Sequence, residues 1–448
     1  MKLRYTFLSG ILAVMTILST PCNAYAKDGD WPNPPEIVSE NAILIDADTG
    51  EILYEKESHQ RSFPASVTKI MTALLTIENC NLGDTVTFSY EAAHSYTMSD
   101  SNIGILTGEQ LTVEQTLRAI LMESANEACF GIGEYISGST ERFVELMNTR
   151  AKELGALDTH FANTNGLHDN NHYTTCYDLA MIGRACFDNS LFTSICSDTA
   201  TYQIAPTNKY KSVRYLRNKH ALLKNRSYYY EYAVGGKTGY TEEAGYTLIS
   251  FAKKNGVRLI CVVMRSTADD RYTDTTSLFE YGFNNFEKTA ITNDTFASYT
   301  SGAASTYVPD DFFGNDKKTL CLENNLYVLL PIGADSSNIT AHADFSDSSF
   351  ATVTFKYFDH VLATENVIVS SADAANSSNL PFIVSEKEEQ TADKQYRIIN
   401  FWIVLAIFGA VAVIIAIIAH IIIMNKTDYG IAKKQKARTR KRLRRRRL

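Results

Sequence analysis

The sequence predicts an α/β (α+β) sandwich with an antiparallel sheet and a helical lobe, followed by a small C-terminal β domain and one transmembrane helix. Three observations predict this arrangement. Apolar, β-rich runs at residues 42–54 and 245–265 enclose a mainly helical stretch at residues 113–192. The composition then shifts toward Ser, Thr, Asn and Asp at residues 289–392, and an apolar run follows at residues 398–424. The 448 residues suffice for two folded domains and targeting segments.

Residues 1–26 are predicted to form a secretory signal peptide. Two basic residues precede an apolar run at residues 6–18, and Ala24-Tyr25-Ala26 supplies a small-residue cleavage site. The apolar run is short for a bilayer span of about 20 residues, which favours cleavage near Lys27 over retention as an anchor.

The predicted transmembrane helix at residues 398–424 has only Asn400 and His420 as polar exceptions. It is long enough to cross a hydrocarbon core of about 30 Å. Residues 425–448 contain 12 Lys and Arg residues and one Asp, so the positive-inside rule places this tail in the cytoplasm. We therefore expect a single-pass protein of the cell membrane whose folded domains are extracytoplasmic.

The charge distribution is uneven. The formal net charge is −7, and the chain without its basic tail carries about −18. The part of the chain predicted to be exported is strongly acidic, which argues against nucleic-acid binding. Beside a membrane helix, the basic tail indicates a topology signal and attraction to anionic lipids.

Seven cysteines remain after removal of the signal peptide, an odd number with no short paired spacing. No histidine lies near them at metal-ligand spacing, so no metal site and no cofactor are predicted. We interpret these cysteines as small buried residues rather than as a disulfide framework.

The first domain, predicted at residues 35–288, opens with a β-hairpin around Asp48-Thr49-Gly50, because Asp and Gly favour turns. A buried helix is expected to start close to Ser66, since apolar residues then recur at helical spacing. Further helices follow, one of them with a Thr175-x-x-Asp178 capping-box pattern. A second hairpin is predicted where Asn255-Gly256 joins two β-rich runs.

The second domain, predicted at residues 289–392, is expected to be built of strands. Its short β-rich runs are residues 326–330, 352–355 and 367–369. The domain has no paired acid, base or nucleophile, so we expect a spacer or dock that holds the first domain off the membrane.

Three motifs in the first domain carry candidate chemistry. The first is Ser66-x-x-Lys69 at the predicted helix start, where the i, i+3 spacing puts the hydroxyl and the amine on one face. A lysine becomes a base for a neighbouring nucleophile when burial and a nearby cation lower its pKa. The helix N-terminus also directs backbone N–H groups toward a developing negative charge.

The other two motifs make this interpretation specific. Ser-x-x-Lys alone is weak evidence, since about two matches are expected by chance in a chain of this length. Ser124-Ala125-Asn126 follows an apolar helical segment, and Lys237-Thr238-Gly239 precedes the second hairpin. The set Ser-x-x-Lys, Ser-Asp-Asn and Lys-Thr-Gly is shared by class A β-lactamases and penicillin-binding proteins. Here the order is kept, and Ala125 replaces Asp in the middle motif.

Four longer stretches extend the pattern. They are ILIDADTG at residues 43–50, PASVTKIMT at residues 64–72, NGLH at residues 165–168 and GKTGYT at residues 236–241. With them, the chain resembles the low-molecular-mass D-alanyl-D-alanine carboxypeptidases, which are serine-type penicillin-binding proteins, over about residues 35–288. The resemblance implies a β-lactamase/penicillin-binding-like sandwich that needs no cofactor. It also implies peptidoglycan stem peptides ending in D-Ala-D-Ala as substrates and β-lactams as inhibitors.

The resemblance implies a catalytic role for four residues. Ser66 would attack the carbonyl between the two terminal D-alanines, and Lys69 would take its proton. Ser124 and Asn126 would relay the proton and orient the substrate amide. Water would then release the shortened peptide from the acyl-enzyme.

The resemblance also implies a substrate-binding strand. Lys237 and Thr238 would bind the terminal carboxylate beside Gly239, and the backbone N–H groups of Ser66 and Tyr240 would form the oxyanion hole.

Five further residues have weaker sequence evidence. Arg271 is a candidate carboxylate contact, with a solvated surface position as the alternative. Lys219 stands where the family usually carries Arg, which bears on the strength of carboxylate clamping. His168 and His172 are expected to be structural, and Cys129 to be a packing residue near the site.

Three alternatives remain open. A β-lactamase would use the same nucleophile but deacylate rapidly through a placed Glu, and no Glu-x-x-Leu-Asn segment lies between Ser124 and Lys237. A D,D-endopeptidase or transpeptidase differs only in the bond cleaved or the acyl acceptor. A non-catalytic peptidoglycan-binding protein would tolerate loss of a motif member, yet all are present.

Overall fold

The computed structural model describes residues 31–97, 99–300, 318–344 and 350–371. The predicted signal peptide, transmembrane helix and basic tail lie outside these residues. In the described part of the chain, no helix is long and apolar enough to span a bilayer.

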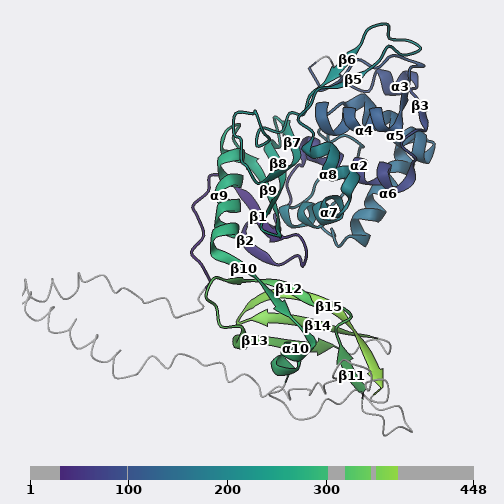
Figure 1. Cartoon of the computed structure of the whole chain (residues 1–448). Helices are drawn as coiled ribbons and strands as arrows, with labels where there is room; N and C mark the ends of the chain where they lie inside the picture. Colours follow the sequence, from purple (N-terminus) through teal and green to yellow (C-terminus); the bar gives the residue numbers. More distant parts are fainter. Residues whose placement is uncertain (1–30, 98, 301–317, 345–349, 372–448) are drawn as a thin grey trace, which may run out of the picture. The chain divides into compact units, whose positions relative to one another are not determined.

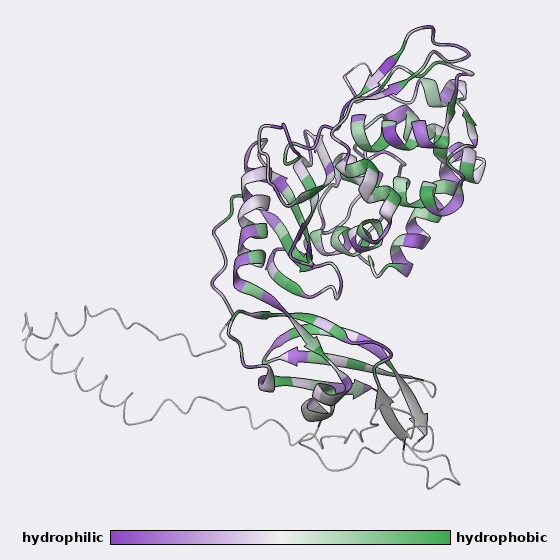
Figure 2. Cartoon of the chain, in the orientation of Figure 1, coloured by the Kyte–Doolittle hydropathy of each residue, from purple (hydrophilic) through white to green (hydrophobic). Residues whose placement is uncertain are grey.

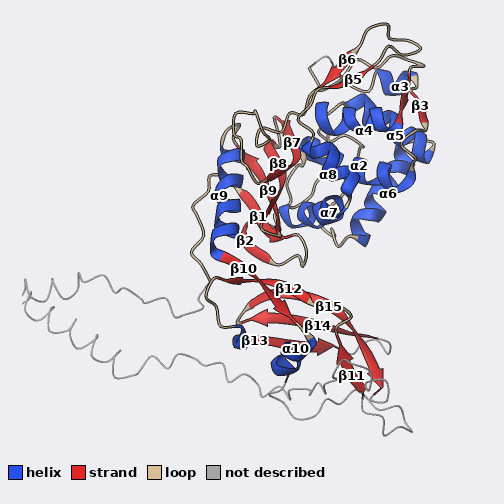
Figure 3. Ribbon diagram, viewed as in Figure 1, coloured by secondary structure: helices blue, strands red, loops and turns tan. Residues whose placement is uncertain are grey.

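A five-stranded antiparallel sheet forms the centre of the predicted first domain (Figures 1 and 3), with the strand order β2-β1-β9-β8-β7. The strands are β1 (Asn41–Asp46), β2 (Ile52–Lys56), β7 (Ala233–Thr241), β8 (Gly245–Lys254) and β9 (Val257–Ser266). Both predicted hairpins are present, β1–β2 and β8–β9. Asn255 and Gly256 turn the second hairpin with positive φ values of 51° and 84°, as a type I′ turn requires.

Both faces of this sheet are covered, which explains why its central strands are continuously apolar. Successive side chains of a strand point to opposite faces. In β1, Ile43 and Ile45 pack against the helical lobe, whereas Ala42 and Leu44 pack against the helix on the other face. Figure 2 shows hydrophobic residues along these strands.

The helices cover the sheet on two sides (Figure 1). Helix α7 packs in the larger cluster on one face, and α9 packs on the other. The helical elements are the 3-10 turn η1 (Ala65–Thr68), α2 (Lys69–Asn79), α3 (Tyr90–Ala93), α4 (Val113–Arg118), the π-helical turn η2 (Ala119–Glu123), α5 (Asn126–Ser137), α6 (Thr140–Glu153), α7 (Cys176–Asp188), α8 (Ser190–Ser197) and α9 (Asp270–Asn285). Two short strand pairs complete the lobe: β3 (Thr85–Thr87) with β4 (Gln110–Thr112), and β5 (Tyr202–Ile204) with β6 (Arg214–Leu216).

The predicted capping box of α7 is half formed. The Thr175 side chain accepts a hydrogen bond from the Asp178 N–H group, as expected. The Asp178 carboxylate does not complete the box, because it accepts hydrogen bonds from the Thr159 hydroxyl and the Asp158 N–H group instead. A complete capping box occurs at Thr112 and Gln115 at the start of α4.

Strands predominate after α9. The elements are β10 (Phe286–Ile291), α10 (Asn293–Thr300), β11 (Lys318–Cys321), β12 (Leu326–Pro331), η3 (Ser336–Asn338), β13 (Ile339–Asp344), β14 (Phe350–Tyr357) and β15 (His360–Ser371). Strand β10 pairs with β12, and the other four form a sheet in the order β11-β15-β14-β13. The three predicted β-rich runs lie in β12, β14 and β15.

The cysteines are mainly core residues, as predicted. Among the described residues, six cysteines are free; Cys80 is half-buried and the other five are buried.

Candidate active site

The Ser66-x-x-Lys69 motif spans the junction of η1 and α2. A tight 3-10 turn, rather than the α-helix itself, carries Ser66, and Lys69 is the first residue of α2. The Lys69 Nζ atom lies 2.8 Å from the Ser66 Oγ atom. Ala65, the residue before Ser66, has a left-handed backbone (φ 52°). Non-glycine residues rarely adopt this conformation, and those that do are concentrated at functional sites.

Lys69 is fully buried and has three hydrogen-bond acceptors. Besides Ser66 Oγ, its Nζ atom donates to Asn126 Oδ1 at 2.8 Å and to the Asn165 carbonyl oxygen at 2.6 Å. The two carbonyl-type oxygens can only accept, so a neutral amine bonded to both directs its lone pair toward the Ser66 hydroxyl. This is the geometry that a general base requires.

Burial lowers the pKa of Lys69 to about 8, because the charged ammonium loses its hydration. Cys129, Glu127 and Asp100 oppose this shift, whereas the Lys219 charge adds to it. Neutral amine therefore makes up about one tenth of Lys69 at pH 7, compared with under one thousandth at an ordinary lysine.

Ser124 lies at the end of η2 in a left-handed conformation (φ 64°, ψ 31°). Single-turn π-helical segments and strained non-glycine residues are both frequent at functional sites. The strained turn brings the Ser124 Oγ atom to 3.0 Å from the Lys237 Nζ atom. Asn126 then begins α5, buried, with its N–H group donating to the Ser101 carbonyl oxygen at 2.9 Å.

Lys237 lies on β7, one of the two edge strands of the sheet, and is buried. Its Nζ atom donates to Ser124 Oγ and, at 2.8 Å, to the Thr238 carbonyl oxygen. Burial, and then the charge of Lys69, hold the pKa of Lys237 well below its usual range. Among the described residues these are its two acceptors, so the protonated side chain, which has three N–H groups, keeps one for an anionic ligand.

Glycine is required where β7 passes Ser66. A Cβ atom at Gly239 would lie 2.9 Å from the Ser66 backbone nitrogen and would overlap the Thr247 hydroxyl. The Thr247 hydroxyl itself donates to the Pro64 carbonyl oxygen at 2.9 Å, which bonds β8 to the chain just before Ser66. The strand can therefore approach the Ser66 N–H group closely only without a side chain at position 239.

Two predicted substrate-binding residues lie apart from this hydrogen-bonded cluster. Tyr240 is half exposed, and its ring packs 4.5 Å from that of Tyr246. The Arg271 guanidinium lies 4.6 Å above the same Tyr246 ring. No hydrogen bond or ion pair engages this guanidinium within the described part of the chain, so the cation is uncommitted. Lys219, in contrast, is paired: its Nζ atom lies 2.9 Å from Glu123 Oε2.

His172 supports the turn that carries Ser66, in agreement with its predicted structural role. Its Nδ1 atom accepts from the Ala162 N–H group, so Nε2 carries the proton and donates to the Thr68 hydroxyl at 2.8 Å. Thr68 in turn donates to the Ala65 carbonyl oxygen. Burial lowers the pKa of His172 to about 3, so the ring is neutral at physiological pH.

Sequence reasoning gave no role to Asn165, although it noted the stretch that contains it. Asn165 binds Lys69 through its backbone carbonyl, which any residue provides, so its side chain type carries no signal. The next residue, Gly166, does give a sequence signal, because an Asn-Gly pair marks a turn. Its φ is +85°, and a Cβ atom there would overlap the Ala65 carbonyl oxygen.

We predict that Gly166→Ala lowers the free energy of unfolding by about 3 kcal/mol, because it combines an unfavourable φ with a backbone overlap. The matched control is Gly155→Ala, where φ is +83° but no atom lies within 4 Å of the added Cβ. This control should cost about 1 kcal/mol. Urea unfolding of both variants measures the difference, and equal losses would contradict the overlap beside Ser66.

The fold and the site together define a class of protein. Solved structures of penicillin-binding proteins have the same α+β fold. Penicillin-binding protein 5 from Haemophilus influenzae aligns with a TM-score of 0.61 and 26% identity over 75% of this chain and 98% of that chain. Penicillin-binding protein 6B from Escherichia coli aligns with a TM-score of 0.57 and 26% identity, over 75% and 97%.

The chain belongs to the D-alanyl-D-alanine carboxypeptidase family, whose model matches residues 29–268. It is 37% identical to the D-alanyl-D-alanine carboxypeptidase DacF of Bacillus subtilis over 287 residues, which cover 62% of this chain and 71% of that protein. It is 30% identical to DacA of Escherichia coli K12 over 337 residues, 72% of this chain and 79% of that protein. It is accordingly a serine-type peptidase with a function in the cell wall.

Proposed function

We propose that this enzyme removes the terminal D-alanine from peptidoglycan stem peptides that end in D-Ala-D-Ala, through an acyl-enzyme on Ser66. The observation that carries the proposal is the buried Lys69 amine, 2.8 Å from the Ser66 hydroxyl and oriented by two carbonyl-type oxygens. The amine removes the Ser66 proton as Oγ bonds to the carbonyl carbon between the two D-alanines. D-alanine leaves with a proton, and water then hydrolyses the ester.

Ser124 and Asn126 complete the proton path and the amide contact in this proposal. The Ser124 hydroxyl bridges toward Lys237, and Asn126 already bonds Lys69 through Oδ1. The Asn126 amide nitrogen has no acceptor among the described side chains and backbone, which leaves it for the substrate carbonyl. Loss of either side chain would disturb both the base and the substrate.

The terminal carboxylate of the substrate is proposed to bind Lys237 and Thr238. A carboxylate there gives the buried Lys237 a counter-charge and an acceptor for its remaining N–H group. The close approach of β7 to the Ser66 N–H group supports an oxyanion hole formed with the Tyr240 N–H group. Arg271 is proposed as an outer carboxylate contact, on the basis of its uncommitted guanidinium beside Tyr246.

We propose further that the enzyme is exported and held at the cell membrane by residues 398–424, with a cytoplasmic basic tail. The sequence of the two termini supports this topology. Residues 289–392 then serve as a spacer domain between the membrane and the catalytic domain.

Transpeptidation is the second candidate, because a solved DD-transpeptidase of Streptomyces K15 aligns with a TM-score of 0.52 and 31% identity over 56% of this chain. Intact-mass analysis with benzylpenicillin, beside an assay of D-alanine release from a pentapeptide, tests both activities. We expect a stable adduct and free D-alanine with tetrapeptide. Crosslinked product in place of tetrapeptide would favour transpeptidation, and rapid loss of the adduct with hydrolysed penicillin and no D-alanine would favour a β-lactamase.

A further inference from the structure

Residues 101–109 connect the catalytic centre to a second polar cluster. At one end of this segment, the Ser101 carbonyl oxygen accepts from the Asn126 N–H group at 2.9 Å. Two residues on, the Ile103 N–H group donates to Glu127 Oε1 at 2.7 Å. The segment is therefore bonded directly to the first turn of α5, which carries the residue that orients Lys69.

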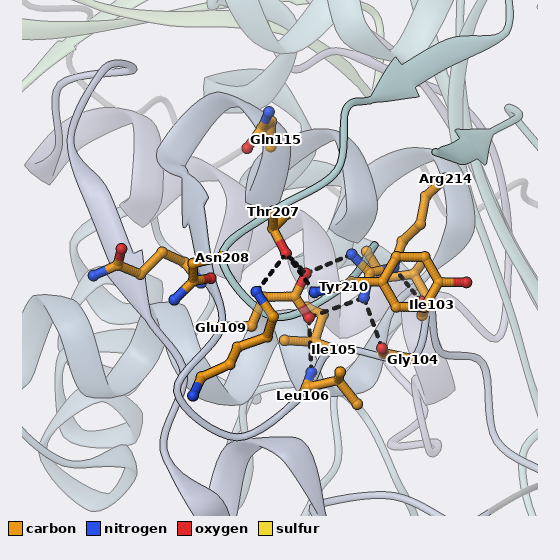
Figure 4. Close-up of polar contacts among 12 residues, drawn as sticks. Ile103, Gly104, Ile105, Leu106, Glu109, Gln115, Thr207, Asn208, Tyr210 and Arg214 are labelled. Atoms are coloured by element: carbon orange, nitrogen blue, oxygen red, sulfur yellow. Dashed lines mark hydrogen bonds and ion pairs between the residues drawn. The ribbon is translucent and has the colours of Figure 1, made fainter. Parts of the chain in front are cut away.

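A buried ion pair holds the other end of the segment (Figure 4). Arg214, from β6, donates to Glu109 Oε1 at 2.6 Å and to Glu109 Oε2 at 2.9 Å. Arg214 is 6% exposed and Glu109 is 0% exposed, so the pair is shielded from water. The same guanidinium donates to the carbonyl oxygens of Ile103 and Gly104, at 2.9 and 2.8 Å. We call this pair the Arg214–Glu109 clamp.

Each side-chain nitrogen of Arg214 and each carboxylate oxygen of Glu109 has a hydrogen-bond partner. Glu109 also accepts from the Leu106 N–H group and from the Thr207 hydroxyl, as Figure 4 shows. Burial alone would raise the pKa of Glu109, but the hydrogen bonds, above all those from Arg214, outweigh it and lower the pKa. The guanidinium lies 3.8 Å above the Tyr210 ring. Fully bonded buried ion pairs fix a geometry, and loss of one partner leaves a costly unpaired charge.

The strand that carries Arg214 also reaches the other flank of Ser124. Directly after β6, the Arg217 N–H group donates to Glu123 Oε1 at 2.8 Å. Lys219 then donates to the Glu123 carbonyl oxygen at 3.0 Å. The clamp thus joins two segments, one bonded just before Ser124 and the other bonded at Asn126.

We propose that Arg214 and Glu109 are positioning residues for acyl transfer. Their ion pair holds residues 101–109 and β6 against both flanks of the Ser124–Asn126 motif, and thereby keeps Asn126 bonded to Lys69 and water away from the Lys69 amine. The inference rests on the roles proposed above for Lys69 and Asn126. Neither clamp residue touches the reacting atoms.

The surroundings of Lys69 determine what release of the clamp would do. The titratable and charged groups that face its amine are Asp100, Glu127, Cys129, His172, Lys219 and Lys237. Burial is the largest cause of the lowered pKa of Lys69. Entry of water beside Asn126 would restore hydration of the ammonium and raise this pKa toward its ordinary value.

The test compares Arg214→Met with Arg258→Met in the full chain. Arg258 is the control, since it also bonds carboxylates and lies over an aromatic ring, but none of its partners belongs to the three motifs: it bonds Asp48 and Asp188 at 2.9 and 2.8 Å and lies 4.3 Å above the Phe187 ring. For each variant, kcat and KM for D-alanine release are measured across the alkaline and neutral range, together with Tm.

Arg214→Met is expected to lower kcat about tenfold or more, with a smaller change in KM, and to move the acid limb of the pH profile up by about one pH unit. Arg258→Met should lower Tm while leaving the acid limb in place. A double variant, Glu109→Met with Arg214→Met, removes the unpaired charge and should regain much of the lost Tm while keeping the shifted limb.

An unmoved acid limb in both Arg214 variants would overturn the positioning role, as would an equal shift in Arg258→Met. Absence of any acid limb in the unmodified enzyme would instead contradict Lys69 as the base. The two failures are therefore distinguishable.

Discussion

Ser66→Ala is expected to abolish covalent labelling by benzylpenicillin and to lower D-alanine release by about 10⁴-fold or more. The reason is that the substitution removes the hydroxyl bonded to Lys69 Nζ, whereas the other two atoms that Nζ bonds among the described residues are carbonyl-type oxygens, which cannot act as nucleophiles. The fold should survive, because Ser66 is half-buried and the carbonyl oxygens of the two preceding residues are bonded by Thr68 and Thr247. Intact-mass analysis after penicillin treatment and an assay of free D-alanine measure the effect.

The matched control for this prediction is Ser227→Ala, which removes an exposed hydroxyl from the same domain and should leave labelling and turnover unchanged. The chain offers a second Ser-x-x-Lys spacing at Ser250 and Lys253, but these residues lie in β8, where an i, i+3 pair points to opposite faces. Ser250 bonds His220 instead, at 2.9 Å. Penicillin labelling that persists in Ser66→Ala would show that the nucleophile lies elsewhere.

Lys69→Arg is expected to lower the acylation rate by about 10³-fold or more while retaining the positive charge. Arginine stays protonated at every accessible pH and cannot take the Ser66 proton. The unmodified enzyme should behave differently. With Lys69 as the proposed base, the active form is the neutral amine. Because its pKa is about 8, acylation should fall about tenfold per pH unit once the pH drops well below 8.

Rates of penicillin acylation measured from about pH 6 to pH 10 test both parts of this prediction. The variant should show no comparable acid limb, and its Tm reports whether the larger guanidinium fits the buried site. Substantial acylation by a folded Lys69→Arg variant would exclude Lys69 as the base, and so would a flat profile in the unmodified enzyme.

Local signals in the sequence were sufficient for much of the fold. The Asn255-Gly256 turn and the apolar runs beside it predicted the β8–β9 hairpin, because a two-residue turn and its strands depend on nearby residues. The incomplete capping box at Thr175 shows the limit of such reasoning. Thr159 lies 19 residues from Asp178 in sequence, and it takes the carboxylate that the local pattern assigned to the helix cap.

The candidate site shows the same division. The motifs singled out Ser66, Lys69, Ser124, Asn126 and Lys237. The fold brings them into two hydrogen-bonded groups, Lys69 with Ser66 and Asn126, and Lys237 with Ser124, and the Ser124–Asn126 backbone joins the two groups. The supporting groups were missed for a physical reason. A backbone carbonyl such as that of Asn165 leaves no mark in the residue type, and the partners of the clamp lie 105 residues apart in the chain.

The sequence by itself determined the chemical groups of the site, their order along the chain and the hairpins and helices that carry them, since these depend on residue type and short-range spacing. Only the tertiary structure decided which groups meet and how they ionise. Lys69 is an ordinary lysine until α2, α5 and the Asn165 turn close around it, exclude water and lower its pKa to about 8. Desolvation by distant segments is a property of the folded chain, and no local pattern encodes it.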